Sequence, residues 1–146
     1  MNYKSHMIGG IITSTISLIL IYLFTDMMTN RTELIYPITV FIFSLYPDLD
    51  TASKPSRHYY IIGILLFIYL VHIYMIFSSF LVILFITLPK MFPHRGFVHT
   101  IRFSIISGAI YYGIIYNIID VEFKYIMASV VIGYLTHLTL DKHIKL

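Results

Sequence analysis

The stretch YYIIGILLFIYLVHIYMIFSSFLVILFITL, residues 59–88, decides the fold of this 146-residue chain. Only His72 and the pair Ser78 and Ser79 interrupt its apolar character. Because a helix needs about 20 apolar residues to span a membrane, the stretch forms either one long tilted helix or two short helices. In the second case a tight turn falls within residues 74–79. The two interpretations place everything after residue 88 on opposite sides of a membrane.

The composition of the whole chain points to a membrane protein. Apolar residues make up 58% of the sequence and charged residues 12%, and the mean hydropathy is +0.84. A soluble domain averages about 45–50% apolar and about 25% charged residues, and disordered chains are more polar still. We therefore predict an all-α, polytopic membrane helical bundle of about six short hydrophobic helices, forming a single domain over residues 1–146.

The basic residues favour two helices in residues 59–88. Further apolar segments cover residues 7–24, which we expect to be a retained span and not a signal peptide, and 34–45, 101–119 and 125–140. If residues 59–88 cross twice, eight of the ten Lys and Arg residues lie on one membrane face, whereas a single crossing divides them five and five. Cytoplasmic loops are enriched in Lys and Arg, so we expect six segments with both chain ends in the cytoplasm.

Ionisable residues at the edges of the predicted spans are the candidates for function, because such residues are costly in a membrane. With six segments, eight of them share the cytoplasmic face. With five segments, the first three would lie opposite the others and no single site could form. The eight candidates are His6, Asp48, Asp50, His94, Arg95, His99, His137 and Asp141.

The residue types at this face indicate a metal site. His137 and Asp141 are four residues apart on a predicted helix, which puts their β-carbons about 6 Å apart. The alternative for this pair is a local hydrogen bond without a metal. For Asp48 and Asp50 the alternative is a solvated turn, and for His94 and His99 it is a loop at the membrane interface. Four histidines and three aspartates without cysteine suit Zn²⁺, Mn²⁺ or Fe. They exceed what one catalytic zinc needs, so we expect one or two ions.

Four motifs resemble those of the YdjM-like family, small bacterial inner-membrane proteins described as LexA-binding, membrane-associated metal-dependent hydrolases. The motifs are SH at residues 5–6, YPDLD at 46–50, HRGFVHT at 94–100 and GYLTHLTLD at 133–141. Tyr46, Val98 and Thr100 depart from the usual Leu, Thr and Ser. The resemblance implies metal-site roles for His6, Asp48, Asp50, His94, His99, His137 and Asp141, with Arg95 as an anion-binding neighbour. The family is also distantly similar to helical zinc-dependent phospholipases C.

Together these features predict an enzyme of the cytoplasmic (inner) membrane whose site faces the cytoplasm. We expect it to hydrolyse a phosphoester, such as a phospholipid headgroup from the surrounding membrane lipid, with a metal-activated water. Arg95 would stabilise the developing negative charge. Asp50 would act as general base, or Asp141 if it is not a metal ligand. The alternative is a non-catalytic membrane regulator or scaffold, in which a structural metal site supports binding of a cytosolic protein partner. The chain has no basic stripe of the kind that binds nucleic acid.

Overall fold

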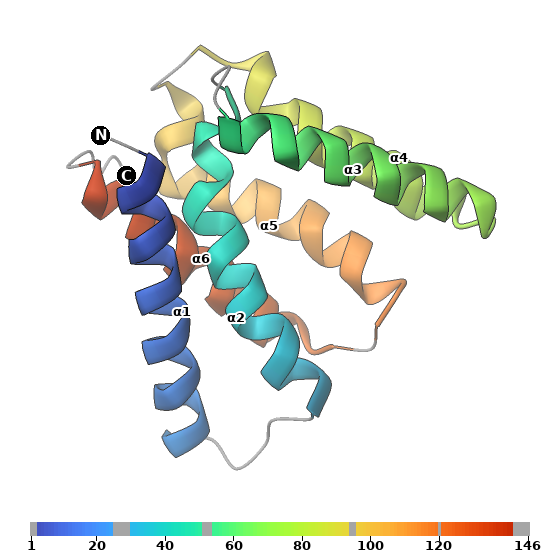
Figure 1. Ribbon diagram of the computed structural model, residues 1–146. Coiled ribbons are helices and arrows are strands. Elements are labelled where there is room, and N and C mark those ends of the chain that lie inside the picture. The colour runs from blue at the N-terminus through green and yellow to red at the C-terminus, as the bar shows by residue number, and fades with distance from the viewer. Residues whose placement is uncertain (1–2, 25–29, 51–53, 94–95, 120, 142–146) are drawn as a thin grey trace.

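The computed structural model describes residues 3–24, 30–50, 54–93, 96–119 and 121–141. Within these ranges the chain is all-helical, as predicted, and contains no β-strand. Short 3-10 helices, labelled η, connect several of the six α-helices (Figure 1). In chain order the elements are α1 (Tyr3–Phe24), α2 (Asn30–Leu45), η1 (Tyr46–Asp50), α3 (Lys54–His72), α4 (Ile76–Thr87), η2 (Leu88–Met91), η3 (Phe97–His99), α5 (Ile101–Tyr116) and α6 (Phe123–Leu140).

Residues 59–88 form two helices, α3 and α4, joined by a tight turn, as the charge distribution predicted. At the end of α3 the Met75 amide donates to the Leu70 carbonyl at 2.9 Å, and the Tyr74 amide donates to the Val71 carbonyl at 3.1 Å. These two bonds form a Schellman motif, which requires a left-handed residue at its end. Tyr74 supplies this conformation, with φ of 61°.

Several helices begin earlier than the apolar segments that predicted them, whereas α5 begins at Ile101 as predicted. α2 starts at Asn30 and α3 at Lys54, four or five residues before the expected apolar runs. Polar and charged residues are common in the first turn of a helix, where the amides lack intrahelical partners. A hydropathy pattern assigns such residues to the preceding loop.

α1, α2 and α6 pack against one another, and α2 contacts both of the others (Figure 1). α5 packs against α6, and the α3–α4 hairpin joins the bundle through contacts of α4 with α5. Gly133 allows α6 to approach α2 closely, since a β-carbon there would lie 3.0 Å from the β-carbon of Phe43 and would also meet the Val40 carbonyl. This close approach brings the end of α6 to the end of α2.

The outer surface of the bundle is apolar. α1 and α6 are long and apolar enough to cross a membrane, while α3, α4 and α5 contribute shorter apolar helices. Large hydrophobic side chains on α1 and α3 point outward, among them Ile12, Ile16, Ile62 and Leu65, each about half exposed or more. Contiguous exposed apolar surface of this kind marks contact with a membrane or another protein.

Candidate metal centre

His137 and Asp141 at the end of α6 form the middle of a buried polar cluster. His137 is fully buried, and its Nε2 lies 3.3 Å from Oδ2 of Asp141, one helical turn later. The other ring nitrogen, Nδ1, lies 3.0 Å from the Ser44 carbonyl oxygen at the end of α2 and donates to it. A hydrogen bond of this kind fixes the tautomer and leaves the Nε2 lone pair available to a ligand.

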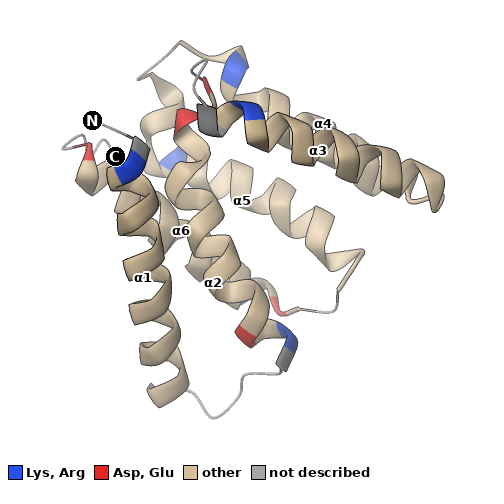
Figure 2. Ribbon diagram, in the orientation of Figure 1, with Lys and Arg blue, Asp and Glu red and all other residues tan. Residues whose placement is uncertain are grey.

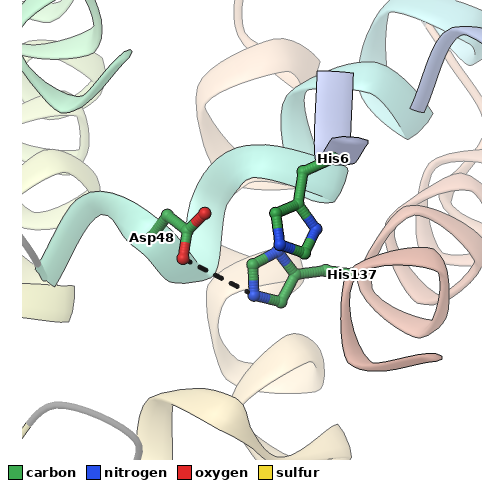
Figure 3. A group of neighbouring side chains, drawn as sticks. All are labelled: His6, Asp48 and His137. Carbon is green, nitrogen blue, oxygen red and sulfur yellow. Dashed lines mark ion pairs between the residues drawn. The ribbon is translucent and has the colours of Figure 1, made fainter. Parts of the chain in front are cut away.

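α1 contributes His6 to the same cluster. Its side chain is 2% exposed, and its Nε2 lies 3.0 Å from Oδ1 of Asp141. The His6 ring stacks on the ring of His137 with centroids 4.4 Å apart (Figure 3). The start of α1 and the end of α6 are thereby joined at the Asp141 carboxylate, which turns one oxygen to each histidine.

The two aspartates of the YPDLD motif reach the cluster from η1. Oδ1 of Asp48 lies 3.8 Å from Nε2 of His137, and Figure 3 marks this ion pair with a dashed line. The Asp50 side chain is 1% exposed, and its Oδ2 lies 3.6 Å from Nε2 of His99. Because η1 continues directly from α2 through Pro47, this helix delivers both carboxylates to the end where α1 and α6 meet.

η3 contributes His99, which is 3% exposed. Its Nδ1 lies 4.0 Å from Oδ2 of Asp141, and its ring centroid is 5.3 Å from that of His137. The neighbouring carbonyl of Val98 accepts a hydrogen bond from the buried hydroxyl of Tyr134. Since Tyr134 is on α6, one turn before His137, this bond holds η3 beside the cluster.

These side chains meet the requirements of a divalent metal site. Ligand atoms lie within 4.8 Å of one another in two groups that share His137: His6, Asp48 and His137, and His99, His137 and Asp141. Nδ1 of His6 and Nε2 of His137 are buried and make no hydrogen bond within the described ranges. Leaving a buried polar atom unbonded costs about 1–3 kcal/mol, so nitrogen atoms of this kind fit a metal ion as partner.

The carboxylates of the cluster favour a cation. Asp141 lies just past the apolar span of α6. The close approach of the His137 ring holds the pKa of the Asp141 carboxyl well below its usual range, although burial opposes the shift. A lowered pKa favours the charged form of this carboxylate, and η1 brings the Asp48 and Asp50 carboxyl groups to the same cluster. A divalent cation would complement this set of groups.

The structure brings six of the eight predicted residues together: His6, Asp48, Asp50, His99, His137 and Asp141. His94 and Arg95 lie outside the described residues. Gly96, which follows them, donates its amide to the Pro93 carbonyl at 3.0 Å. Sequence reasoning did not assign a role to Ser44 or Tyr134. Ser44 acts through its main-chain carbonyl, which leaves no signal in the sequence, whereas Tyr134 lies in the GYLTHLTLD motif.

Basic side chains surround the cluster end of the bundle. Lys4 lies near His6 at the start of α1, Arg102 follows His99 at the start of α5, and Arg57 and Lys90 belong to α3 and η2, which contact η1. Arg31 and Glu33 lie at the start of α2, and Glu122 and Lys124 lie at the start of α6. Figure 2 shows both kinds of charge at the start of α2, away from the cluster. Among the described residues, more Lys and Arg residues therefore lie at the cluster end than at the opposite end. The six-segment prediction required such an excess of basic residues on one face.

The comparisons with known proteins agree with the motifs. A family model described as YdjM inner membrane protein matches residues 1–145. No match was found to a curated protein or to a solved structure. The match covers nearly the whole chain and includes every residue of the cluster. The chain belongs to the YdjM inner membrane protein family.

Proposed function

We propose that this protein is a membrane-bound metal-dependent hydrolase that cleaves a phosphoester at the cluster of histidines and aspartates. The observation that carries the proposal is the convergence of three imidazoles and three carboxylates from α1, η1, η3 and α6, with two buried imidazole nitrogens unbonded within the described ranges. Four separate segments supply these side chains. Packing of the helices alone would not require an ionisable side chain at any of these positions.

We assign the metal-ligand roles to His6, Asp48, His99, His137 and Asp141, with Asp50 and His94 as further candidates. His137 can serve only one ion, because its Nδ1 donates to the Ser44 carbonyl. Asp141 directs one oxygen to Nε2 of His6 and the other to Nε2 of His137, so it can fix the His6 tautomer whose Nδ1 lone pair would face a metal ion. The nitrogen and oxygen donors suit Zn²⁺, with Mn²⁺ or Fe as alternatives, and one or two ions per chain.

A bound divalent ion supplies Lewis-acid polarisation of a phosphoryl oxygen and lowers the pKa of a coordinated water. We assign the general-base role to Asp50, because its carboxylate is buried and lies 3.6 Å from Nε2 of His99, which can orient it and share its proton. Arg95 is the neighbour whose guanidinium would pair with the phosphoester anion, since a planar fork of donors matches phosphate oxygens. The remaining carboxylates and imidazoles hold the metal.

The proposed topology is a polytopic bundle in a single domain, with the cluster at the cytoplasmic side of the inner membrane. The basic residues at the cluster end support this orientation. α4, with 12 residues, reaches only about 18 Å at 1.5 Å per residue, short of the roughly 30 Å hydrocarbon core. We therefore propose that the α3–α4 hairpin enters the bilayer without crossing its full thickness.

Single cysteines test the topology, since the chain has no native cysteine. Tyr74→Cys lies in the α3–α4 turn, where the native side chain is 88% exposed, and Thr139→Cys lies at the cluster end. In intact cells we expect a membrane-impermeant maleimide to label neither residue, because Tyr74 stays within the bilayer and Thr139 faces the cytoplasm. In inside-out vesicles we expect it to label Thr139→Cys alone. Labelling of Thr139→Cys from the periplasmic side would reverse the proposed orientation.

Metal content and hydrolysis test the enzymatic proposal. We expect the detergent-purified protein to retain one or two zinc ions per chain and to hydrolyse bis(para-nitrophenyl) phosphate. His137→Ala and Asp141→Ala should lose both properties, because each removes a central ligand. His72→Ala is the matched control, since His72 is exposed at the far end of α3, and it should keep both. A protein without a transition metal, or with metal binding unchanged in both variants, would contradict the proposal.

The regulator or scaffold is the second candidate, because a metal that joins α1, η1, η3 and α6 could serve stability alone. Arg95→Ala separates the two functions. An enzyme should lose turnover while it keeps the metal and the fold. If the metal is only structural, Arg95→Ala should also keep the metal, but the purified wild-type protein should show no hydrolysis.

A further inference from the structure

An apolar groove lies between the α3–α4 hairpin and the helices α2 and α5. Its volume is about 370 Å³. Each of the four helices lines it, through residues that include Phe41, Gly63, Leu66, Phe85 and Ile115. Figure 1 shows the hairpin on one side of this region and α5 on the other. Gly63 on α3 faces α4, because a β-carbon at Gly63 would lie 2.7 Å from the Ile86 side chain.

The groove offers hydrocarbon contacts and no free polar group. The two hydroxyl-bearing side chains that line it have partners within the protein: Tyr59 donates to the Ile42 carbonyl at 2.7 Å, and the Tyr111 hydroxyl lies 3.2 Å from that of Thr39. An apolar cavity does not hold water stably. A ligand that fits this groove therefore presents methylene groups.

The groove opens onto the apolar outside of the bundle. Ile62 and Ile118 line it and are 64% and 43% exposed. In a member of an inner-membrane family, this opening faces the acyl chains of the bilayer. The molecules available to enter it from the side are the lipids themselves.

One aromatic pair separates the groove from the metal centre. Phe85 lines the groove, and its ring stacks on that of Tyr46 with centroids 4.3 Å apart. Tyr46 also donates to the Phe85 carbonyl at 2.7 Å, and it is the first residue of η1, which carries Asp48 and Asp50. A chain-like molecule in the groove would thus have one end beside η1 and the cluster.

Positive charge lies at that end of the groove. The Lys90 ammonium group lies 3.9 Å from the centre of the Tyr60 ring, and the Tyr60 hydroxyl donates to the Leu49 carbonyl in η1 at 3.0 Å. Arg57 is exposed in the first turn of α3, three residues before Tyr60. These charges complement an anionic headgroup.

We propose that the groove binds one acyl chain of an anionic phospholipid whose headgroup phosphoester lies at the metal centre. The groove then selects a substrate with a hydrocarbon tail, and Lys90 and Arg57 favour a negatively charged headgroup. The assignment of this lipid as substrate rests on the proposed hydrolase function, whereas the binding itself does not.

Native mass spectrometry of the detergent-purified protein, titrated with phosphatidylglycerol, tests the binding. Leu66→Trp fills the groove. Leu65→Trp is the matched control, because Leu65 is the preceding residue on α3, is 62% exposed and does not line the groove. We expect one tightly bound lipid per chain for the wild type and for Leu65→Trp, and an affinity lower by about tenfold or more for Leu66→Trp. Ile115→Trp fills the groove from the α5 wall and should have the same effect.

Zinc content of each variant reports whether the cluster end has folded, so a loss of lipid with zinc retained assigns the effect to the groove. Three results would overturn the proposal: no saturable lipid binding by the wild type, equal weakening by Leu65→Trp, or a dimer that Leu66→Trp converts to monomer. The last result would assign the groove to a second copy of the chain. Lipid binding by a protein that holds no metal would overturn the hydrolase and leave the groove assignment intact.

Discussion

The close contact of α6 with α2 at Gly133 determines whether the metal centre can form, and Gly133→Ala tests this dependence. The added β-carbon would lie 3.0 Å from that of Phe43 and would overlap the Val40 carbonyl. Both neighbours belong to α2, and the carbonyl is main chain, so the two helices must move apart. His137 lies one turn further along the same face of α6 and loses its alignment with the Ser44 carbonyl.

The expected cost follows from three contributions. Overpacking of a core position costs about 1–3 kcal/mol, and loss of the bond from His137 to Ser44 costs about 1 kcal/mol. Replacement of glycine by alanine within a helix returns about 1 kcal/mol. We therefore expect Gly133→Ala to lower the free energy of unfolding by about 1–3 kcal/mol. Because loss of a bond that orients a metal-bound histidine typically weakens metal affinity 10- to 100-fold, zinc affinity should fall by about that factor.

Gly113→Ala on α5 is the matched control. There the added β-carbon would meet only the end of a flexible side chain, Cδ1 of Leu81 at 2.9 Å. The control should be as stable as the wild type or up to about 1 kcal/mol more stable, with unchanged zinc affinity. The assays are denaturant unfolding in detergent and competition with a zinc chelator. If the two variants have the same stability and the same zinc affinity, the contact at Gly133 does not support the site.

Three further substitutions test other parts of the account. Tyr74→Gly should raise the free energy of unfolding by up to about 1 kcal/mol, because the φ of 61° strains any residue with a β-carbon, and thermal unfolding in detergent measures the change. Tyr134→Phe should lower it by about 1–3 kcal/mol by leaving the buried Val98 carbonyl unbonded, and chelator competition should show weaker zinc binding because η3 carries His99. Asp50→Asn should reduce phosphoester hydrolysis by about 100-fold or more with zinc content retained, and a loss of zinc instead would make Asp50 a ligand.

The division of residues 59–88 into two helices could be predicted, but the place of the turn could be predicted only approximately. The sequence predicts it within residues 74–79, and in the structure it lies at residues 73–75, between the end of α3 and the start of α4. The distribution of Lys and Arg over the whole chain favours two helices over one, and this argument needs no turn motif within residues 59–88. The turn itself uses Tyr74 in a conformation that glycine or asparagine normally adopts. A hydropathy or propensity pattern therefore does not mark it. Packing of α3 against α4 stabilises this conformation from outside the local sequence.

The residues of the candidate site could be predicted because ionisable side chains are rare in this chain. Costly groups such as His6 and Asp141 stand out against apolar segments, and alternating helix directions place them at one end. What holds them there could not be predicted. The Ser44 carbonyl acts through the main chain, and the stacking of His6 on His137 depends on how α1 and α6 cross α2. The groove likewise arises from the packing of four helices.

Zinc K-edge X-ray absorption of the purified protein tests the central claim most directly, because it reports the atoms around the metal. We predict a shell of nitrogen and oxygen ligands at about 2.0–2.1 Å, with the multiple scattering of imidazole rings, that is lost in His137→Ala and kept in His72→Ala. Absence of zinc, or a zinc shell without imidazole that is the same in both variants, would contradict the account.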